Sequence, residues 1–478
     1  MATAPTRDEN LKSIGEQAHP DIPDVSGIPL VGNTVEMARD PAAFFLRAYR
    51  DYGPVYRVNV FGRKTIVIAG PEAAMFMTTR EGRDCLRSKE FWGDFVDFHG
   101  ASKTLTGEDG ETHEKLRRIM RKGFSKAAVE GQYHRLAEIT DDAIARDWLT
   151  KTHVPVVEAF QYMIVQQLGE IMTGDAPLEY VRDIRINILY LLNTLVSRQR
   201  PKLFLQSPEF KKANARVNEL GAKMISDFKA HAKADTLPQN LLGDIMRGHA
   251  TDPDLIQDRD LALLLTGPYV AGLDTVANTV AAAVYGILKT PGVLERVQKE
   301  ADSLFEKEVV REQDLNSLHA INGAIMEAMR LWPIAVAQMR TATREFVFED
   351  HVIPEGSMIY IGTSVPHFME EFFPNPEQFD VDRYQRPRAE HLKKGAYSPF
   401  GRGPHSCLGQ SLAEVQMALT VSRVFHRLDL ELIDPDYILK TKSAPTPGPS
   451  TNFKVRVCGE RNPARNLKPE VREEKSNV

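Results

Sequence analysis

Apolar residues recur every three or four positions through most of residues 111–318, the spacing expected of helices with one buried face. Shorter apolar or alternating runs at residues 55–60 and 65–69 are typical of strands, and Phe61, Gly62 and Arg63 between them favour a hairpin. Strand-like runs return at residues 352–361, 430–433 and 453–458. The pattern therefore predicts a single large domain that is mainly α-helical, with small β-sheets.

The most apolar stretch, residues 261–288, is typical of a buried helix rather than of a membrane span, because Pro268 and Asp274 interrupt it. Residues 1–20 are polar and carry several charges, so we expect a flexible segment with neither a signal peptide nor a membrane anchor. Residues 460–478 are charged and poor in apolar residues, and we expect them to be disordered. The domain would then occupy residues 21–459.

Composition limits the function and the location. The chain has 478 residues, 42% hydrophobic and 26% charged, which is the make-up of a soluble globular protein. Its net charge of −5 gives no bulk attraction to nucleic acid. The three cysteines, Cys85, Cys407 and Cys458, are too few and too widely spaced for a disulfide framework, which indicates a reducing, cytoplasmic environment.

Cys407 carries the strongest chemical signal, because it lies at the tip of a glycine-rich loop just before a helical pattern. The partial positive charge of a helix N-terminus is expected to lower the pKa of its thiol and so to favour a thiolate. Gly403 and Gly409 allow a large flat partner to approach the backbone, and the basic residues Arg402 and His405 suit an anionic one. These features suit a heme with sulfur on its iron. The alternative is an inert buried cysteine.

This loop closely resembles the heme-binding loop of the cytochrome P450 family, whose pattern is F-x-x-G-x-(R/H)-x-C-x-G. The matching residues are Phe400, Gly403, His405, Cys407 and Gly409. The resemblance extends from about residue 23 to residue 458 and implies the family's fold, mainly α with small β-sheets. It also implies heme b as the cofactor, with Cys407 as the metal ligand.

Glu327 and Arg330 lie three residues apart and so share one helix face. Alone this is a weak signal, since most such pairs are solvated and worth ~0.2–0.5 kcal/mol. Here the segment resembles the family's K helix, and Arg383 matches the arginine that completes its Glu-Arg-Arg network. Val381 stands where the family usually has proline, which implies looser local packing. The implied role is structural, to hold the region that presents the Cys407 loop.

Gly272, Asp274 and Thr275 lie inside the apolar stretch, where they work against helix stability. Glycine costs about 1 kcal/mol relative to alanine, and such local exceptions often mark function. The segment resembles the family's oxygen-activation motif, A-G-x-(D/E)-T-(T/S). By this resemblance Gly272 opens a groove for dioxygen, Thr275 hydrogen-bonds dioxygen and Asp274 delivers protons through water. Val276 replaces the usual second hydroxyl, and Pro268 should bend the helix. A polar patch facing another helix is the alternative.

His113 and Arg117 lie four residues apart, on one helix face. The segment resembles the family's C helix, whose basic groups bind the heme propionates, and the same resemblance adds Arg340 and His405 to that set. Arg118, Arg121 and Lys122 continue the positive run. These three either attract an acidic electron donor or form an ordinary solvated face.

The resemblance also implies a substrate pocket of mostly apolar or small side chains. It places one group of them in the loop before the C helix and the others on the apolar helix, after the K helix and at a late turn. These residues are Phe91, Trp92, Phe95, Phe98, Val270, Ala271, Ile334, Ala335, Val336 and Thr446. They favour a lipophilic substrate but do not identify it, and core packing explains the aromatic residues equally well.

The resemblance implies a monooxygenase that activates dioxygen and hydroxylates or otherwise oxidises a lipophilic small molecule. Too few residues follow Cys458 for a reductase domain, so we expect electrons from a separate ferredoxin and ferredoxin reductase. We expect a soluble monomer with no nucleic-acid partner and no membrane span. Two alternatives stay open, a peroxygenase of the same fold and a non-catalytic heme-thiolate sensor or binding protein. Asp274 and Thr275 count against both.

Overall fold

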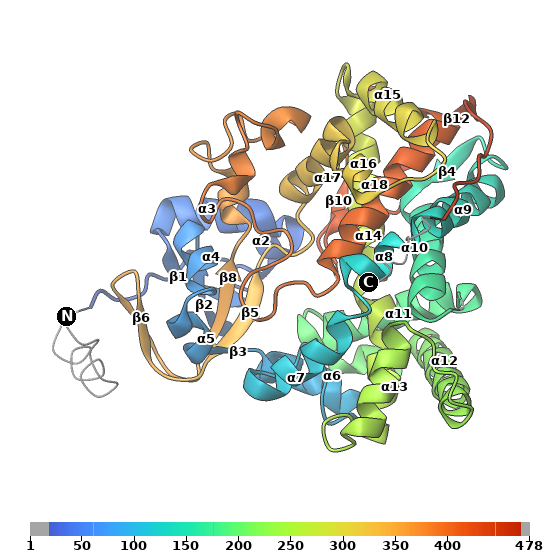
Figure 1. Cartoon of the computed structure of the whole chain (residues 1–478). Helices are drawn as coiled ribbons and strands as arrows, with labels where there is room; N and C mark the ends of the chain where they lie inside the picture. Colours follow the sequence, from blue (N-terminus) through green and yellow to red (C-terminus); the bar gives the residue numbers. More distant parts are fainter. Residues whose placement is uncertain (1–18, 61, 175, 445, 470–478) are drawn as a thin grey trace, which may run out of the picture. The chain divides into compact units, whose positions relative to one another are not determined.

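A computed structural model describes residues 19–469 except 61, 175 and 445, and it confirms the predicted combination of many helices with small sheets (Figure 1). The described chain divides into two compact units. Unit 1 comprises the chain up to Phe91 together with Ala335–Pro374 and Leu392–Ser406. Unit 2 comprises Trp92–Ile334, Asn375–His391 and the chain from Cys407 onward. Each unit thus combines segments that are far apart in the sequence.

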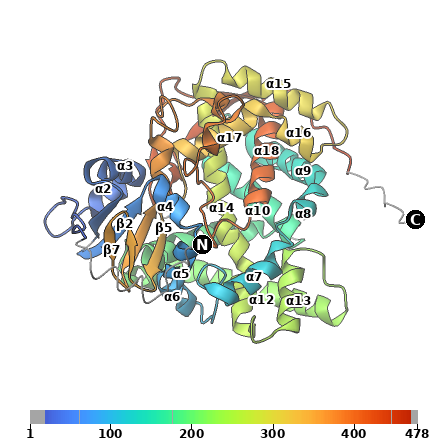
Figure 2. The same ribbon diagram turned by 60° about the vertical axis from the view of Figure 1, so that its left-hand side comes forward.

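Unit 1 is built on a five-stranded sheet with the order β1-β2-β8-β5-β3. The predicted hairpin is confirmed, since β1 (Val55–Val60) and β2 (Arg63–Ala69) pair antiparallel. Strand β2 pairs parallel with β8 (Met358–Gly362), and β8 pairs antiparallel with β5 (Gln338–Ala342). The remaining elements of this unit, of which α2 and α3 stand beside the sheet in Figure 2, are α2 (Thr34–Arg39), α3 (Pro41–Tyr52), α4 (Pro71–Phe76), α5 (Arg80–Cys85), β3 (Leu86–Arg87), β6 (Phe346–Phe348), β7 (His351–Ile353) and η5 (Val365–Phe368).

Both faces of this sheet are covered, and β2 shows how. Successive side chains of a strand point to opposite faces. Ile66 and Ile68 accordingly pack in one apolar cluster with Phe346, whereas Val67 packs in another with Phe44. A strand buried on both faces needs the nearly continuous apolar run that residues 65–69 supply. The sheet therefore gives unit 1 a two-sided core.

Unit 2 is organised around α14 (Asp258–Lys289), which runs through its middle in Figure 1 and is buried along most of its length. It continues as one helix through Pro268. By length and composition α14 could cross a membrane, but 78% of its most apolar window is buried inside the protein, as in the core helix of a globular protein. The neighbours that pack on α14 include α10 (Val156–Met172), α12 (Pro208–Lys233), α17 (His319–Leu331) and α18 (Gln410–Arg427).

The other elements of unit 2 surround this core. Its three-stranded sheet has the order β4-β12-β9, and a separate two-stranded ribbon pairs β10 with β11. The strands are β4 (His153–Pro155), β9 (Leu428–Leu432), β10 (Thr441–Lys442), β11 (Gly448–Pro449) and β12 (Lys454–Glu460). The helices are α7 (Gly110–Arg121), α8 (Lys126–Glu130), α9 (Tyr133–Ala143), η1 (Ile144–Trp148), η2 (Leu178–Tyr180), α11 (Val181–Leu191), η3 (Leu192–Val196), η4 (Lys202–Gln206), α13 (Leu241–Thr251), α15 (Val293–Phe305), α16 (Glu312–Asn316) and η6 (Val381–Tyr384). Two short helices, α6 (Lys89–Phe98) and η7 (Glu390–Leu392), lie where the chain passes from one unit to the other.

The expectation that the chain is disordered from residue 460 onward is wrong for residues 461–468. Arg461 forms an ion pair with Asp302 of α15 at 3.0 Å, and Lys468 pairs with Glu308. Leu467 is buried. The charged composition that is typical of disorder instead supplies ion-pair partners for the helices of unit 2. Residues 1–18 and 470–478, which include most of the first segment expected to be flexible and the end of the second, lie outside the described residues.

Candidate active site

Cys407 lies three residues before the start of α18, where Gly409 is the N-cap. Its side chain is accessible to solvent. The sulfur is nevertheless close to many protein atoms, and burial raises the pKa of the Cys407 thiol above its ordinary value. The Gly409 N–H and the charge of Arg117 act in the opposite direction without reversing the shift. The predicted lowering of this pKa is therefore wrong for the protein alone, because desolvation outweighs the end of the helix.

In unit 1 the loop that leads to Cys407 is shaped by its own contacts. Gly403 has a φ of +76°, and a Cβ there would lie 2.5 Å from the carbonyl oxygen of Met77, so the backbone itself requires glycine. Arg402 donates from Nε to Ser398 Oγ at 2.6 Å and from Nη2 to the Tyr397 carbonyl at 2.9 Å. The expected role of Arg402 toward an anionic partner thus gives way to bracing of the loop. Phe400 and His405 are half-buried.

In unit 2 the acid and the alcohol of the predicted oxygen-activation motif have different environments. Asp274 is only 4% exposed, and its Oδ1 accepts a hydrogen bond of 2.6 Å from Nε2 of Gln161 on α10. Thr275 is half-buried, and its hydroxyl donates to the carbonyl of Ala271 at 2.8 Å. The carboxylate is thus held inside the protein, whereas the hydroxyl lies closer to solvent.

The backbone at Gly272 has a packing role that the sequence did not indicate. A Cβ at this position would lie 2.7 Å from Cδ1 of Leu168. The missing side chain therefore makes room for the end of the Leu168 side chain of α10, while Gly272 itself stays half-buried. Further open space lies on the same helix.

That space lies along a stripe of small residues on α14, at positions 267, 271 and 275. Ala271 is exposed, and Gly267 and Thr275 are half-buried, although the residues around them on this helix are mostly buried. A Cβ added at Gly267 would meet nothing within 4 Å. Because residues four apart share a helix face, these three form one accessible stripe in the mostly buried middle of the helix. Val270, predicted to line the pocket, is half-buried beside it.

Glu327 of α17 is the centre of a fully buried polar network in unit 2. Arg330 donates to both of its carboxylate oxygens at 2.7 Å, and Arg383 donates to Oε1 at 3.0 Å. The structure thus brings together the three residues named from the sequence. It adds Tyr384, whose hydroxyl donates to Glu327 at 2.6 Å, and Glu390, which accepts from Arg383.

Arg330 and Arg383 also join α17 to the chain that follows Pro374. Arg330 donates to the carbonyls of Pro376 and Gln378, and Arg383 donates to that of Asn375. Burial alone would lower the pKa of Arg330, but the bonds and the charge of Glu327 outweigh it, so this pKa lies above its usual value. Val381, which replaces the family's proline, is buried at the start of η6. These bonds and the packing of Val381 hold the segment in this structure.

The predicted basic face lies on α7. His113 is buried and Arg117 is half-buried on the same side of this helix, while Arg118, Arg121 and Lys122 are exposed. Burial lowers the pKa of Arg117, and the negative charge of a Cys407 thiolate would oppose that shift. The Arg117 guanidinium is therefore close enough to act on the sulfur electrostatically. In unit 1, Arg340 is buried and donates to the carbonyl of Met339 at 2.7 Å.

The aromatic residues expected in a loop before the C helix lie on helix α6 instead. Trp92 and Phe95 pack edge to face, with ring centroids 5.7 Å apart, and Phe98 packs against Phe210 of α12. The spacing of these apolar residues suits one face of a helix, which explains why the segment is helical. The rings of Phe91 and Phe95 are buried. Among the other predicted pocket residues, Ala335 is exposed and Ile334 is half-buried. Val336 and Thr446 are buried.

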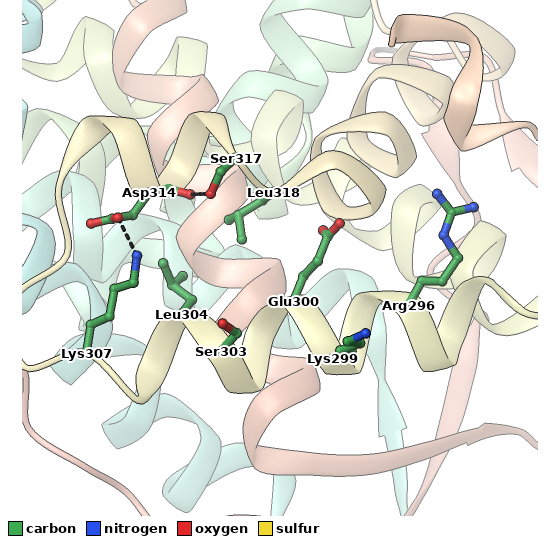
Figure 3. Close-up of a pocket in the computed structure, with 9 residues that line it drawn as sticks. All are labelled: Arg296, Lys299, Glu300, Ser303, Leu304, Lys307, Asp314, Ser317 and Leu318. Carbon is green, nitrogen blue, oxygen red and sulfur yellow. Dashed lines mark hydrogen bonds and ion pairs between the residues drawn. The ribbon is translucent and has the colours of Figure 1, made fainter. Parts of the chain in front are cut away.

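A pocket of about 380 Å³ in unit 2 shares no residue with any of these groups (Figure 3). It lies along α15 and α16. Of its charged groups Lys307 pairs with Asp314, Arg296 pairs with Asp382, and Glu300 accepts from the first N–H groups of α17. Because most of its charged groups already have partners, the pocket has the character of a solvated surface hollow rather than of a reaction site.

Comparison with known proteins identifies the chain. A sequence model of the family described as Cytochrome P450 matches residues 22–454. The chain belongs to the cytochrome P450 family. It is 25% identical over 419 residues to cyclooctat-9-en-7-ol 5-monooxygenase of Streptomyces melanosporofaciens, covering 84% of this chain and 87% of that protein. It is also 25% identical over 419 residues to abscisic acid 8'-hydroxylase 1 of Arabidopsis thaliana, with 86% and 85% covered.

Solved structures agree on the fold of this P450. The retinoic acid-bound cyanobacterial CYP120A1 superposes with a TM-score of 0.79 at 20% identity, covering 92% of this chain and 99% of that one. The heme domain of cytochrome P450DA gives 0.80 at 21% identity, with 94% and 99% covered. The family relationship makes this protein a P450 monooxygenase, an enzyme class that combines a heme-thiolate cofactor with dioxygen, redox partners and a lipophilic substrate.

The residues of unit 2 fit such a cofactor. Among the described residues, no group of three or more His, Cys, Asp or Glu side chains could hold a metal ion, so a metal at Cys407 needs ligands from outside the chain, such as porphyrin nitrogens. A bound metal ion would also remove the thiol proton that burial otherwise retains. The accessible sulfur, the nearby Arg117 charge and the stripe of small residues on α14 suit a large, flat, anionic group.

Proposed function

We propose that this P450 hydroxylates, or otherwise oxidises, a lipophilic small molecule with dioxygen. The cofactor would be heme b, with electrons from a separate ferredoxin and its reductase in the cytoplasm, and the enzyme would act as a monomer. The observation that carries the proposal is the accessible sulfur of Cys407 in a unit whose central helix presents Thr275 on a stripe of small residues. In the overall reaction one oxygen atom enters the substrate and the other leaves as water, with two electrons and two protons consumed.

Cys407 would bind the iron through its sulfur. The heme would supply dioxygen activation, and thiolate ligation favours cleavage of the O–O bond. His113 and Arg117 on α7 would pair with the propionates, and we propose the same role for Arg340 and His405 from the family resemblance. Phe400, Gly403 and Gly409 would shape the binding loop. The buried network of Glu327, Arg330 and Arg383 would hold the region that presents it.

Protons would reach the reaction through Thr275 and Asp274. The Thr275 hydroxyl donates to Ala271 and can turn to donate toward the accessible side of α14. Asp274 would take up protons from water and pass them on, which a carboxylate with one bonded oxygen can do. This pair favours the monooxygenase over a peroxygenase and over a heme-thiolate sensor, since neither alternative needs delivered protons.

The substrate is proposed only by class. The residues Phe95, Val270, Ala271, Ile334 and Val336 are apolar or small, which suits a lipophilic compound. The two relatives named above are named for different substrates, cyclooctat-9-en-7-ol and abscisic acid, so they do not narrow the choice for this chain.

Spectroscopy and turnover test the proposal. Reduced holoprotein exposed to carbon monoxide should show the red-shifted Soret band of thiolate ligation, and Cys407→Ser should lose it. Product formed with NADH, ferredoxin and reductase would support the monooxygenase, and product formed only with peroxide would favour the peroxygenase. The protein could instead show a normal thiolate spectrum but no turnover under either condition, even with lipophilic compounds that shift the heme spin state. That result would favour the heme-thiolate sensor or binding protein.

A further inference from the structure

Gln161 on α10 is a buried polar residue that the proposed function does not use. It is 1% exposed, and its Nε2 donates to Oδ1 of Asp274 at 2.6 Å. The two residues are 113 positions apart in the sequence, so the bond ties α10 directly to the motif on α14. Within the part of the chain that the structure describes, the Gln161 amide is the one side-chain group that donates a hydrogen bond to the Asp274 carboxylate. Charge-assisted bonds of this length are strong and directional.

The bond from Gln161 holds Oδ1 of Asp274 and does not involve Oδ2. With Oδ1 held by the amide, rotation of the Asp274 side chain is restricted, so the direction in which Oδ2 points is set from α10. A residue that delivers protons must present its free oxygen in a fixed place, because proton transfer depends on short, aligned contacts. Gln161 is therefore placed to control this geometry without touching the reacting atoms.

The charge of a lysine also acts on Asp274. Lys442 of β10 lies near Asp274 in unit 2: burial lowers the pKa of Lys442, the charge of Asp274 opposes that shift, and Arg185 adds to it. The ribbon that carries Lys442 is itself seated on α14, because Asn278 Nδ2 donates to the carbonyl of Pro447 at 3.3 Å. A carboxylate released by Gln161 would be free to turn toward this ammonium group and away from water.

We propose that Gln161 is a positioning residue for proton delivery: by holding Oδ1 of Asp274 it keeps the carboxylate aimed for transfer. This inference rests on the proposed monooxygenase function. If Gln161 only filled space between α10 and α14, any side chain of similar volume would serve. If it acts as a donor, a side chain of the same size without N–H groups should disturb proton delivery and leave substrate binding intact.

Gln161→Met tests this distinction, because methionine is close to glutamine in size and lacks the donor. Gln167→Met is the matched control: Gln167 is also fully buried on α10, and it donates to Thr140 and Thr420 rather than to Asp274. Both variants are measured as holoenzymes with NADH, ferredoxin and reductase. The readouts are the fraction of electrons recovered as product, the peroxide released and the solvent deuterium isotope effect on turnover.

We expect Gln161→Met to lower the fraction of electrons recovered as product by ~10–100-fold, on the scale of one hydrogen bond to a charged group. Its isotope effect should change, while the spin-state shift with a bound substrate should stay as in the wild type. Gln167→Met should keep wild-type coupling. Equal losses in the two variants, or wild-type coupling in Gln161→Met, would overturn the inference.

A readout independent of turnover comes from infrared spectra. The carboxyl band that disappears in Asp274→Asn holoenzyme should shift in Gln161→Met and stay in place in Gln167→Met, and an unmoved band in Gln161→Met argues against the proposed contact. Should Gln161→Met not fold, Gln161→Leu also removes the amide donor and offers no other, so wild-type coupling in that variant would also overturn the inference. If the wild-type protein forms no product that depends on dioxygen, the proposed function itself is wrong. This result can be distinguished from failure of the Gln161 inference, which is judged from the variants.

Discussion

Arg423 of α18 donates from Nε to Oδ1 of Asp141 on α9 at 2.9 Å, and both residues are buried. Arg427, one turn further along α18, donates to the same carboxylate. Asp141 thus pairs with two buried cations of the helix that begins just after Cys407, and Arg427 also pairs with Glu460 at 2.6 Å. Removal of one partner from a buried ion pair leaves an uncompensated charge, which is strongly destabilising.

We therefore expect Asp141→Asn to lower the free energy of unfolding by about 3–5 kcal/mol. Urea unfolding of the holoprotein measures this change. Asp142→Asn is the control, because the neighbouring side chain is exposed and surface changes usually stay within about 0.5 kcal/mol. Equal unfolding midpoints for the two variants would show that the buried pair contributes little.

Arg383→Lys should weaken both the fold and heme retention. The arginine bonds Glu327, Glu390 and the carbonyl of Asn375 at once, and a lysine cannot reproduce that planar set of donors. We expect a loss of roughly 3–5 kcal/mol in unfolding free energy. Thermal unfolding and the heme content after purification are the measurements.

The control for that change is Arg388→Lys on the same segment. The Arg388 side chain is 38% exposed and pairs with Asp380 at 2.8 Å and with Glu390 at 2.7 Å. Ion pairs of such an exposed side chain, which lysine can also form, are expected to be worth about 0–1 kcal/mol each. If both lysine variants lose the same stability, the buried network has no special structural role.

Thr275→Ala should separate electron consumption from product formation. NADH oxidation continues, but without the hydroxyl we expect most electrons to appear as peroxide, with product yield falling by about tenfold or more, near the lower end of the effects expected for proton-transfer groups. Thr279→Ala, one turn further on α14, removes a hydroxyl that donates to the Thr275 carbonyl at 2.9 Å, and it should leave coupling unchanged. Unaltered coupling in Thr275→Ala would remove this residue from the proton route.

Heme-free protein should have an unreactive Cys407. Because burial raises the pKa of its thiol, the protonated form persists through neutral pH and the thiolate appears only as the pH rises above the ordinary cysteine range. Alkylation by iodoacetamide, followed residue by residue by mass spectrometry across alkaline pH, should therefore be slow for this cysteine near neutrality.

The charge of Arg117 provides the matched comparison. It lowers the pKa of Cys407, so Arg117→Met should move the alkylation curve to still higher pH, whereas Arg118→Met, which changes an exposed neighbour, should not. Fast alkylation at neutral pH in the wild type would mean that burial does not dominate.

Local patterns in the sequence predicted much of this architecture. The apolar pattern of residues 55–69 predicted the hairpin of β1 and β2. The spacing of Glu327 and Arg330 predicted that these side chains meet, because about one helix turn separates them. The fold class followed from the cysteine motif and its resemblance to a known family. In these cases the interacting residues are neighbours in the sequence or belong to a known motif.

Long-range contacts explain what was not predicted. Gln161 and Asp274, like Asp141 and Arg423, meet only because distant helices pack together, and no spacing rule indicates such pairs. The direction of the Cys407 pKa shift failed for the same reason, since a helix end can be recognised in a sequence but desolvation depends on tertiary packing. Charge content also misled us about residues 461–468, because their partners lie on remote helices.

The contacts that residues 461–468 make with unit 2 lead us to expect that cleavage of the chain at this point weakens heme retention. Arg461 and Asn462 both bond Asp302, which also pairs with His426 in the last turn of α18. Protease cleavage just after Glu460 would loosen this end of a helix whose other end begins three residues after Cys407. Shortened protein recovered from cells should thus release its cofactor more readily than intact protein, and purification tags are better placed beyond Lys468.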